Sequence, residues 1–178
     1  MARLPASHWI SEFRDRMASF GLTSGASGLP VSIKIRVDSG CFHREHSPHA
    51  YQIIDDHLRH LDSHRENFRF VEHESGPEIL AYVAAATVGV GLTKSIIDLV
   101  VTVVKARAEG IKNGDHPRHD LELIVRRFDQ KGEYAEEKIL RISSNEPIDA
   151  AKITAALENR PASIATVPPV SKMKRKKR

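Results

Sequence analysis

One cysteine and the histidines that follow it are the residues of this sequence best suited to chemistry. Cys41, His43, His46 and His49 fall within one short segment, "CFHREHSPH". A thiolate and neutral imidazoles are donors that zinc prefers, and a site needs three or four of them within about 2.0 to 2.3 Å of the ion. The local spacing permits such a site, although the paired cysteines of the common zinc motifs are absent.

Further histidines continue this pattern into the next segment. His57, His60 and His64 recur at helical spacing, beside the apolar face of an expected helix. The simplest interpretation makes the histidines a polar, titratable flank of the surface. We therefore expect no cofactor, and keep a metal site formed by Cys41, His43, His46 and His49 as an alternative.

Two other kinds of active site are disfavoured. The segment "GVGLTKS" resembles a phosphate-binding loop, but that motif needs Gly where this chain has Thr93 and Val88. Ser39 or Cys41 beside a histidine would pair a nucleophile with a base, yet no nucleophile elbow or named catalytic signature surrounds either residue. We therefore expect a protein that is not an enzyme, with no catalytic residues and no small-molecule substrate.

The basic charge of the chain is concentrated at its end. The 178 residues carry a formal charge of +4, but the last seven residues hold six Lys or Arg. Without those six of the 27 basic residues, 21 remain against 23 acidic ones, so the rest of the chain is not basic. The basic residues of the tail are Lys172, Lys174, Arg175, Lys176, Lys177 and Arg178. Lacking aromatic residues, the tail is suited only to non-specific contact with nucleic acid or anionic lipid.

Apolar periodicity predicts the elements that would position these residues. Val31 to Val37 alternate apolar and polar side chains, which indicates a half-buried strand. The expected elements are this strand, a helix over 49–64, a strand around 67–73, a long helix over 79–106, a hairpin of 120–128 with 135–143, and a helix from about 145. This order predicts an α+β fold in which a small mixed sheet of about four strands carries the long apolar helix.

The segment 79–106 is the most apolar part of the chain and is long enough to cross a membrane. Its polar residues nevertheless fall in one narrow sector of a helical wheel that continues to Glu109 and Lys112. Within that sector, Lys94 and Asp98 would each cost roughly 2.5 to 3.5 kcal/mol near a bilayer centre. We therefore predict a core helix with one edge in water. A single-pass membrane anchor with its C-terminus in the cytoplasm is the alternative.

The apolar arc of this helix is too wide for one sheet to cover. The N-terminal helix, with Trp9 and Phe13, is one candidate cover, and a second copy of the chain is another. Small residues on the helix would allow another backbone to approach closely. The predicted interaction surface consists of Ala85, Gly89, Val90, Gly91, Lys94 and Asp98.

Composition divides the chain into four parts. An amphipathic helix is expected over 1–22, a flexible Gly/Ser-rich linker over 23–30, a single α+β domain over 31–160 and a disordered basic tail over 161–178. A lone cysteine excludes an internal disulfide and is typical of a reducing compartment. The N-terminus has no continuous apolar region of the secretory type, so we expect a cytoplasmic protein.

The succession "VSIKIRVDSG", "ENFRFVEHESGPE", the small-residue apolar helix, "DLELIVRRF", "EYAEEKILRIS" and "NEPIDAAKITAALEN" resembles the effector-associated constant component domains of bacterial conflict systems. The resemblance is one of element order and apolar pattern, and it covers roughly Val31 to Asn159. It implies a non-catalytic accessory module that couples an effector, such as a protease or nuclease, to partner components. A protein partner or self-association is therefore the expected mode of action, and no functional residue carries over.

Overall fold

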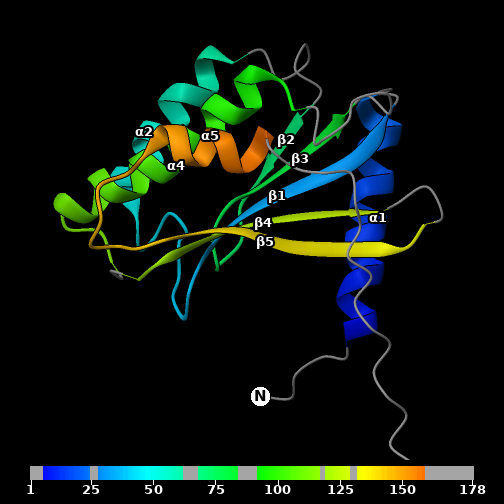
Figure 1. Cartoon of the computed structure of the whole chain (residues 1–178), viewed down its shortest axis with the longest axis horizontal. Coiled ribbons are helices and arrows are strands. Elements are labelled where there is room, and N and C mark those ends of the chain that lie inside the picture. The colour runs from blue at the N-terminus through cyan, green and yellow to red at the C-terminus, as the bar shows by residue number, and fades with distance from the viewer. Residues whose placement is uncertain are drawn as a thin grey trace, which may run out of the picture.

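The computed structural model describes residues 6–24, 28–61, 68–83, 92–116, 119–128 and 132–158, which are coloured in Figure 1. Four helices and five strands are formed within these ranges. In chain order they are α1 (Ala6–Ser24), β1 (Leu29–Val37), α2 (Pro48–His60), β2 (Phe68–Val71), β3 (Glu78–Val83), α4 (Lys94–Lys112), β4 (Leu121–Phe128), β5 (Tyr134–Ile142) and α5 (Ala150–Glu158).

The strands form one sheet in the order β2-β3-β1-β4-β5, and every neighbouring pair is antiparallel. The β1-α2-β2 and β3-α4-β4 units each place their two strands apart, with another strand between them. This is the split βαβ arrangement of ferredoxin-like folds, extended here by β5 and α5. The predicted α+β class is confirmed. The sheet has five strands, one more than expected, and it is antiparallel rather than mixed.

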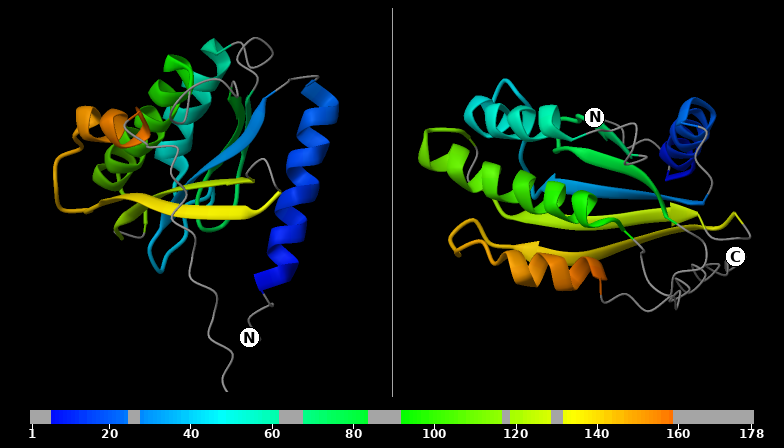
Figure 2. Two further views of the ribbon diagram at one scale, coloured as in Figure 1. Left: turned by 45° about the vertical axis from the view of Figure 1, so that its right-hand side comes forward. Right: turned by 90° about the horizontal axis from the view of Figure 1, so that it is seen from above.

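Three helices cover one face of this sheet. Figure 2 shows α2, α4 and α5 side by side on that face, with α4 in the middle. Alternate β1 residues point into the core beneath them, and Ile33 and Ile35 are fully buried there. Val100, Val103 and Val104 of α4 meet them from the helix side. Alternate residues of the strand and the apolar side of the helix are thus buried in one core, and this burial stabilises the packing of the helices on the sheet.

The N-terminal helix α1 packs on the opposite face of the sheet (Figure 2). Phe13, Met17 and Phe20 are buried against Leu80 of β3. The ring of Phe13 also stacks on Phe128 of β4, with their centroids 5.4 Å apart. Of the two candidate covers for the long apolar helix, α1 is therefore excluded: it covers the far side of the sheet, and α4 packs on the sheet between its neighbouring helices.

The long helix predicted over 79–106 begins later than expected. Glu78–Val83 forms the strand β3, and the helix α4 starts at Lys94, where the Thr93 side chain accepts a hydrogen bond from the Ile96 N–H. Ile79 and Ala81 face the helices, while Leu80 faces α1. A strand buried on both faces shows no alternation of apolar and polar residues, so its pattern resembles that of a buried helix.

The other elements lie close to their predicted positions. The strand predicted over 31–37 and the predicted hairpin are confirmed, with β1 beginning two residues early at Leu29 and α5 beginning later than expected, at Ala150. The segment 84–91 and the basic tail lie outside the described residues, and so do Ala85, Gly89, Val90 and Gly91 of the predicted interaction surface. In the ranges that the structure describes, no helix has both the length and the apolar character needed to cross a bilayer.

Candidate functional site

The loop between β1 and α2, residues 38–47, carries the predicted metal donors and is anchored at several points. The Phe42 N–H donates to the Glu74 carbonyl at 2.7 Å, and the Phe42 side chain is fully buried. The Tyr51 hydroxyl donates to the Phe42 carbonyl at 3.1 Å. Because its backbone is attached both to the segment before β3 and to α2, the loop presents its side chains in a defined arrangement.

Three of the four predicted donors converge on one point of this loop. Cys41 Sγ lies 3.7 Å from His46 Nδ1, which in turn lies 3.3 Å from His43 Nε2. One donor atom from each residue falls within 4.8 Å of the other two. Cys41 and His43 are half-buried and His46 is exposed, so the cluster is open to solvent on one side. Burial raises the pKa of the Cys41 thiol.

The backbone around these donors is fixed by a tight turn. The N–H groups of His46 and Ser47 both donate to the His43 carbonyl, at 3.2 and 3.0 Å. The His46 carbonyl accepts from the His116 N–H at 3.0 Å. The Glu45 N–H donates to His43 Nδ1 at 3.2 Å, which orients that ring.

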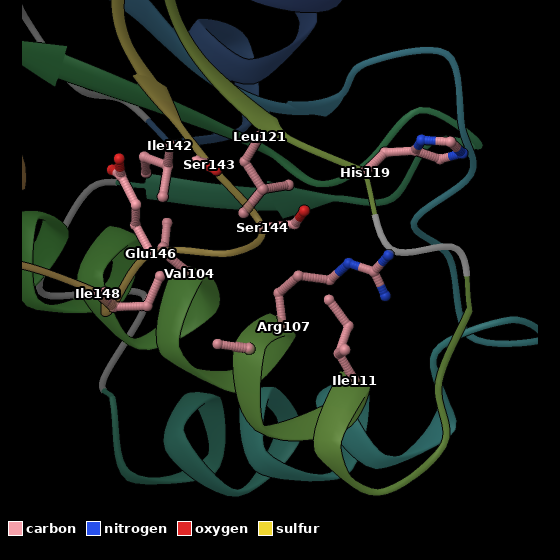
Figure 3. Close-up of a pocket in the computed structure, with 11 residues that line it drawn as sticks. Val104, Arg107, Ile111, His119, Leu121, Ile142, Ser143, Ser144, Glu146 and Ile148 are labelled. Atoms are coloured by element: carbon pink, nitrogen blue, oxygen red, sulfur yellow. The ribbon is translucent and has the colours of Figure 1, made fainter.

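Beneath the loop lies Arg107 of α4, whose side chain is almost fully buried. Its Nη1 donates to the Ser47 hydroxyl at 3.1 Å, and its guanidinium lies over the ring of Phe42, 5.1 Å from the centroid. The guanidinium group of Arg107 therefore lies against the inner surface of the loop 38–47 and links this loop to α4. Arg107 also lines a small cavity of about 30 Å³ between α4 and the ends of β4 and β5. Figure 3 shows the residues that line this cavity.

The fourth predicted donor, His49, belongs to a different site. Its Nδ1 lies 2.8 Å from Asp115 Oδ1, and the other Asp115 oxygen accepts the Ala50 N–H at 2.9 Å. Asp115 is buried at the N-terminal end of α2, where a carboxylate is stabilised by unpaired backbone N–H groups. Burial alone would raise the pKa of Asp115, but the hydrogen bonds from Ala50 and His49 hold it below its usual range. His49 is therefore engaged in capping α2.

The histidines expected beside the apolar face of α2 were not predicted to converge with the loop residues, and the two that the structure describes, His57 and His60, do not join the cluster. The His60 ring is bonded to the Asp56 carbonyl of its own helix at 2.6 Å, and His64 lies outside the described residues. His57 lies on α2, half-buried. Among the described residues, the group of donors that could hold a metal ion consists of Cys41, His43 and His46.

A second buried polar cluster, which the sequence pattern did not indicate, lies between α1 and the sheet. Glu78 of β3 is fully buried, and its carboxylate accepts from Arg16 of α1 at 2.8 Å, from His73 at 2.9 Å and from the Ser32 hydroxyl. Lys34 is also buried and donates to the Gly76 carbonyl at 2.5 Å. These contacts join α1 to the sheet, so the cluster has a structural role in positioning that helix.

A groove runs along α4 on the helix face of the molecule and is here called the α4 groove. It has a volume of about 770 Å³ and lies between α4, Ile53 of α2 and the segment 144–148 that leads to α5. Its apolar lining includes Ala106, Ile111 and Ile148, and Lys105 lies exposed at its rim. Among the residues described, Ile53 is the large apolar side chain left exposed, at 36%.

Lys94 and Asp98, the described members of the predicted interaction surface, are exposed at the start of α4. Lys105, Glu109 and Lys112 continue the same exposed edge. The polar stripe predicted for this helix is thus confirmed over α4. The α4 groove lies along the later part of that stripe, which the sequence pattern did not distinguish from the earlier part.

Comparison with known proteins identifies no family model, no curated protein and no solved structure that matches this chain.

Proposed function

We propose that this chain is a non-catalytic interaction module that binds a partner protein through the α4 groove. The observation that carries the proposal is a groove of about 770 Å³ whose apolar lining includes the exposed side chain of Ile53. Apolar surface that folding leaves open beside a polar rim is a common mark of a protein-binding site.

The lining of the groove favours an amphipathic helix as its occupant. Ala108 of α4 is small and half-buried, so a second helix can approach closely there, and Ile53 and Ile111 offer apolar contacts on either side. Lys105 is exposed at the rim, and no ion pair to it is present within the described residues. An acidic residue at the edge of the bound helix would complement this charge.

The resemblance to effector-associated domains suggests which partner to test. In that family the partner would be an effector such as a protease or nuclease, which this chain would couple to other components. A cytoplasmic location accords with the single, unpaired cysteine. A second copy of the chain is the competing occupant, and measurements of the oligomeric state distinguish it from a different protein.

The proposal can be tested by co-expressing the chain with the products of its neighbouring genes and measuring complex formation by light scattering. We expect a one-to-one complex that is lost in Ile53→Asp and strongly weakened in Lys105→Glu. Lys94→Glu is the matched control, because it reverses an equally exposed charge on the same helix outside the α4 groove. Binding that survives both groove variants, or a chain that only self-associates, would overturn the proposal.

A further inference from the structure

We infer that Cys41, His43 and His46 form a binding site for one zinc-type divalent metal ion, with a fourth position open to solvent. This inference revises the expectation of a merely polar histidine flank, and it is independent of the α4 groove. The site lies in the loop 38–47, at the end of the helix layer where β1 leads into α2.

Two of the three distances between the donor atoms match those of a tetrahedral site, and the third pair lies within 4.8 Å. With bonds of about 2.0 to 2.3 Å, neighbouring ligand atoms of a tetrahedral zinc ion lie about 3.3 to 3.7 Å apart. The observed separations are 3.3 Å between His43 Nε2 and His46 Nδ1, and 3.7 Å between His46 Nδ1 and Cys41 Sγ. These two pairs of donors are therefore already at the spacing that coordination requires.

Hydrogen bonding alone accounts for only one of these two contacts. His43 Nε2 and Cys41 Sγ both approach the same atom, His46 Nδ1. A neutral imidazole nitrogen offers one lone pair, so it cannot accept good hydrogen bonds from both neighbours at once. An ion between the three atoms would give each of them a ligand bond.

The surroundings favour an exchangeable, zinc-type ion. One thiolate and two imidazoles form a donor set that zinc accepts, whereas calcium and magnesium require oxygen ligands. His46 is exposed, which provides a path for entry. Three protein ligands leave one position for water or for a donor from another molecule.

Binding must also move two protons: the Cys41 thiol releases its proton to solvent when it becomes a thiolate ligand, and one proton changes position on His43. The Glu45 N–H donates to His43 Nδ1, so the proton of the neutral ring is on Nε2, the atom that faces the cluster. Coordination through Nε2 moves this proton to Nδ1 and displaces the hydrogen bond from Glu45. The amide resonance of Glu45 is therefore a direct reporter of metal binding.

Titration of the chelator-treated full chain with Co²⁺ tests the site. We expect saturation at one ion per chain, a thiolate-to-cobalt charge-transfer band, and displacement of cobalt by Zn²⁺. Cys41→Ser should abolish the band, and His46→Ala should weaken binding by at least about tenfold. The matched control is His60→Ala, which removes an exposed histidine outside the cluster and should leave the titration unchanged.

Protection of the thiol provides a second measurement in the wild-type chain, in case a substitution alters folding. Alkylation of Cys41 by iodoacetamide should slow strongly when zinc is present. No saturable cobalt binding, a charge-transfer band that survives Cys41→Ser, or alkylation that is indifferent to zinc would each overturn the inference. Lys105→Glu should leave cobalt binding intact, so failure of the α4 groove proposal would not be mistaken for failure of the metal site.

Discussion

Lys34 and Glu78 stand directly opposite each other in the antiparallel pairing of β1 with β3, and both side chains are buried. The carboxylate is held by Ser32, His73 and Arg16, while the ammonium group donates to the Gly76 carbonyl. This pair therefore places two ionisable groups, with opposite responses to burial, at the interface between α1 and the sheet.

Glu78 should make the protein sensitive to acid. Burial alone would raise its pKa, but hydrogen bonds from His73 and Ser32 and the charges of Arg16 and Arg126 lower it from 4.5 to about 2. A folded pKa below the unfolded value contributes stability above pH 4.5, and this contribution is lost as the pH falls toward 2. Glu78→Gln should therefore cost roughly 3 kcal/mol of unfolding free energy at neutral pH.

Urea denaturation of wild type and Glu78→Gln at a series of pH values checks this. The difference between the two proteins should shrink steadily below pH 4.5. Glu12→Gln is the control, because Glu12 is an exposed carboxylate on α1 that, within the described residues, pairs with His8 at the surface. A difference that stays constant down to the lowest pH would show that the charge of Glu78 is unimportant.

Lys34 should produce a second rise of stability with pH, in neutral to alkaline solution. Burial lowers its pKa from 10.5 to about 7, and the charge of Glu78 only partly offsets this. Between these two values the unfolded chain holds a proton that folded Lys34 has released, so stability should rise with pH. Each pH unit of such a difference is worth about 1.4 kcal/mol, so a total rise of a few kcal/mol is expected.

The variant Lys34→Met isolates this effect, because it keeps an apolar stem and has no proton to release. The alkaline rise in unfolding free energy, measured by urea denaturation, should be absent from Lys34→Met. The charged groups that influence Lys34 are Glu78, Arg126, Arg16 and Arg36. An equal rise of the unfolding free energy in the wild type and in Lys34→Met would show that groups other than Lys34 cause it.

The strand β1 shows why this cluster could not be predicted from the sequence. The alternation of Val31 to Val37 correctly indicated a strand with an apolar face, and it also suggested that Ser32 and Lys34 face water. Both are buried because α1, separated from β1 in the chain by only a few residues, folds back over that face. The alternation of apolar and polar residues indicates a strand, but it does not show which other element packs on each face of that strand.

The metal donors of the loop 38–47 were likewise only partly predictable from the sequence. The spacing of Cys41, His43 and His46 was sufficient to nominate them, since a short turn can bring together residues two to five positions apart. His49 was nominated on equal grounds, yet Asp115, 66 positions away, engages its ring. Contacts between residues so far apart depend on the packing of α2 against α4, which spacing within one segment does not reveal.

The packing of α4 against α2 depends on Gly110. A Cβ atom there would lie 2.9 Å from both Ala50 N and Ala50 Cβ, and 2.1 Å from Asp115 Oδ2. Alanine favours an isolated helix over glycine by about 1 kcal/mol. Steric conflict in a close-packed interface costs typically 1 to 3 kcal/mol and here also disturbs the cap on α2. Gly110→Ala should therefore be destabilising by about 1 to 2 kcal/mol.

Thermal and urea denaturation of Gly110→Ala measure this balance between helix propensity and packing. Glu109→Ala is the matched control, since it lies one position away on α4 with an exposed side chain and should change stability little. A more stable Gly110→Ala would mean that the two helices are free to separate.

The anchoring of α1 gives a further prediction. Phe13 is fully buried and contacts the rings of Phe128 and Tyr134, at centroid distances of 5.4 and 5.9 Å. Phe13→Ala should destabilise the protein by about 3 to 5 kcal/mol, because it leaves a cavity between the helix and the sheet. Hydrogen exchange should show α1 losing protection before α4 does. Uniform loss of protection throughout the chain would show instead that α1 and the sheet unfold as one unit.

Substitutions on the two sides of α4 test the assignment of its polar edge to solvent. Ile97 is 6% exposed and packs in the core, whereas Lys94, one turn earlier, is exposed. Ile97→Asp buries a charge with no partner and should cost more than about 4 kcal/mol, enough to unfold a marginally stable domain. Lys94→Leu should be tolerated within about 0.5 kcal/mol, because a surface substitution disturbs no packing. Circular dichroism and the yield of folded protein without detergent measure both effects. If α4 were surrounded by lipid, Lys94→Leu would instead strongly stabilise the protein, because it removes a charge from the bilayer. The wild type would then be recovered only with membranes.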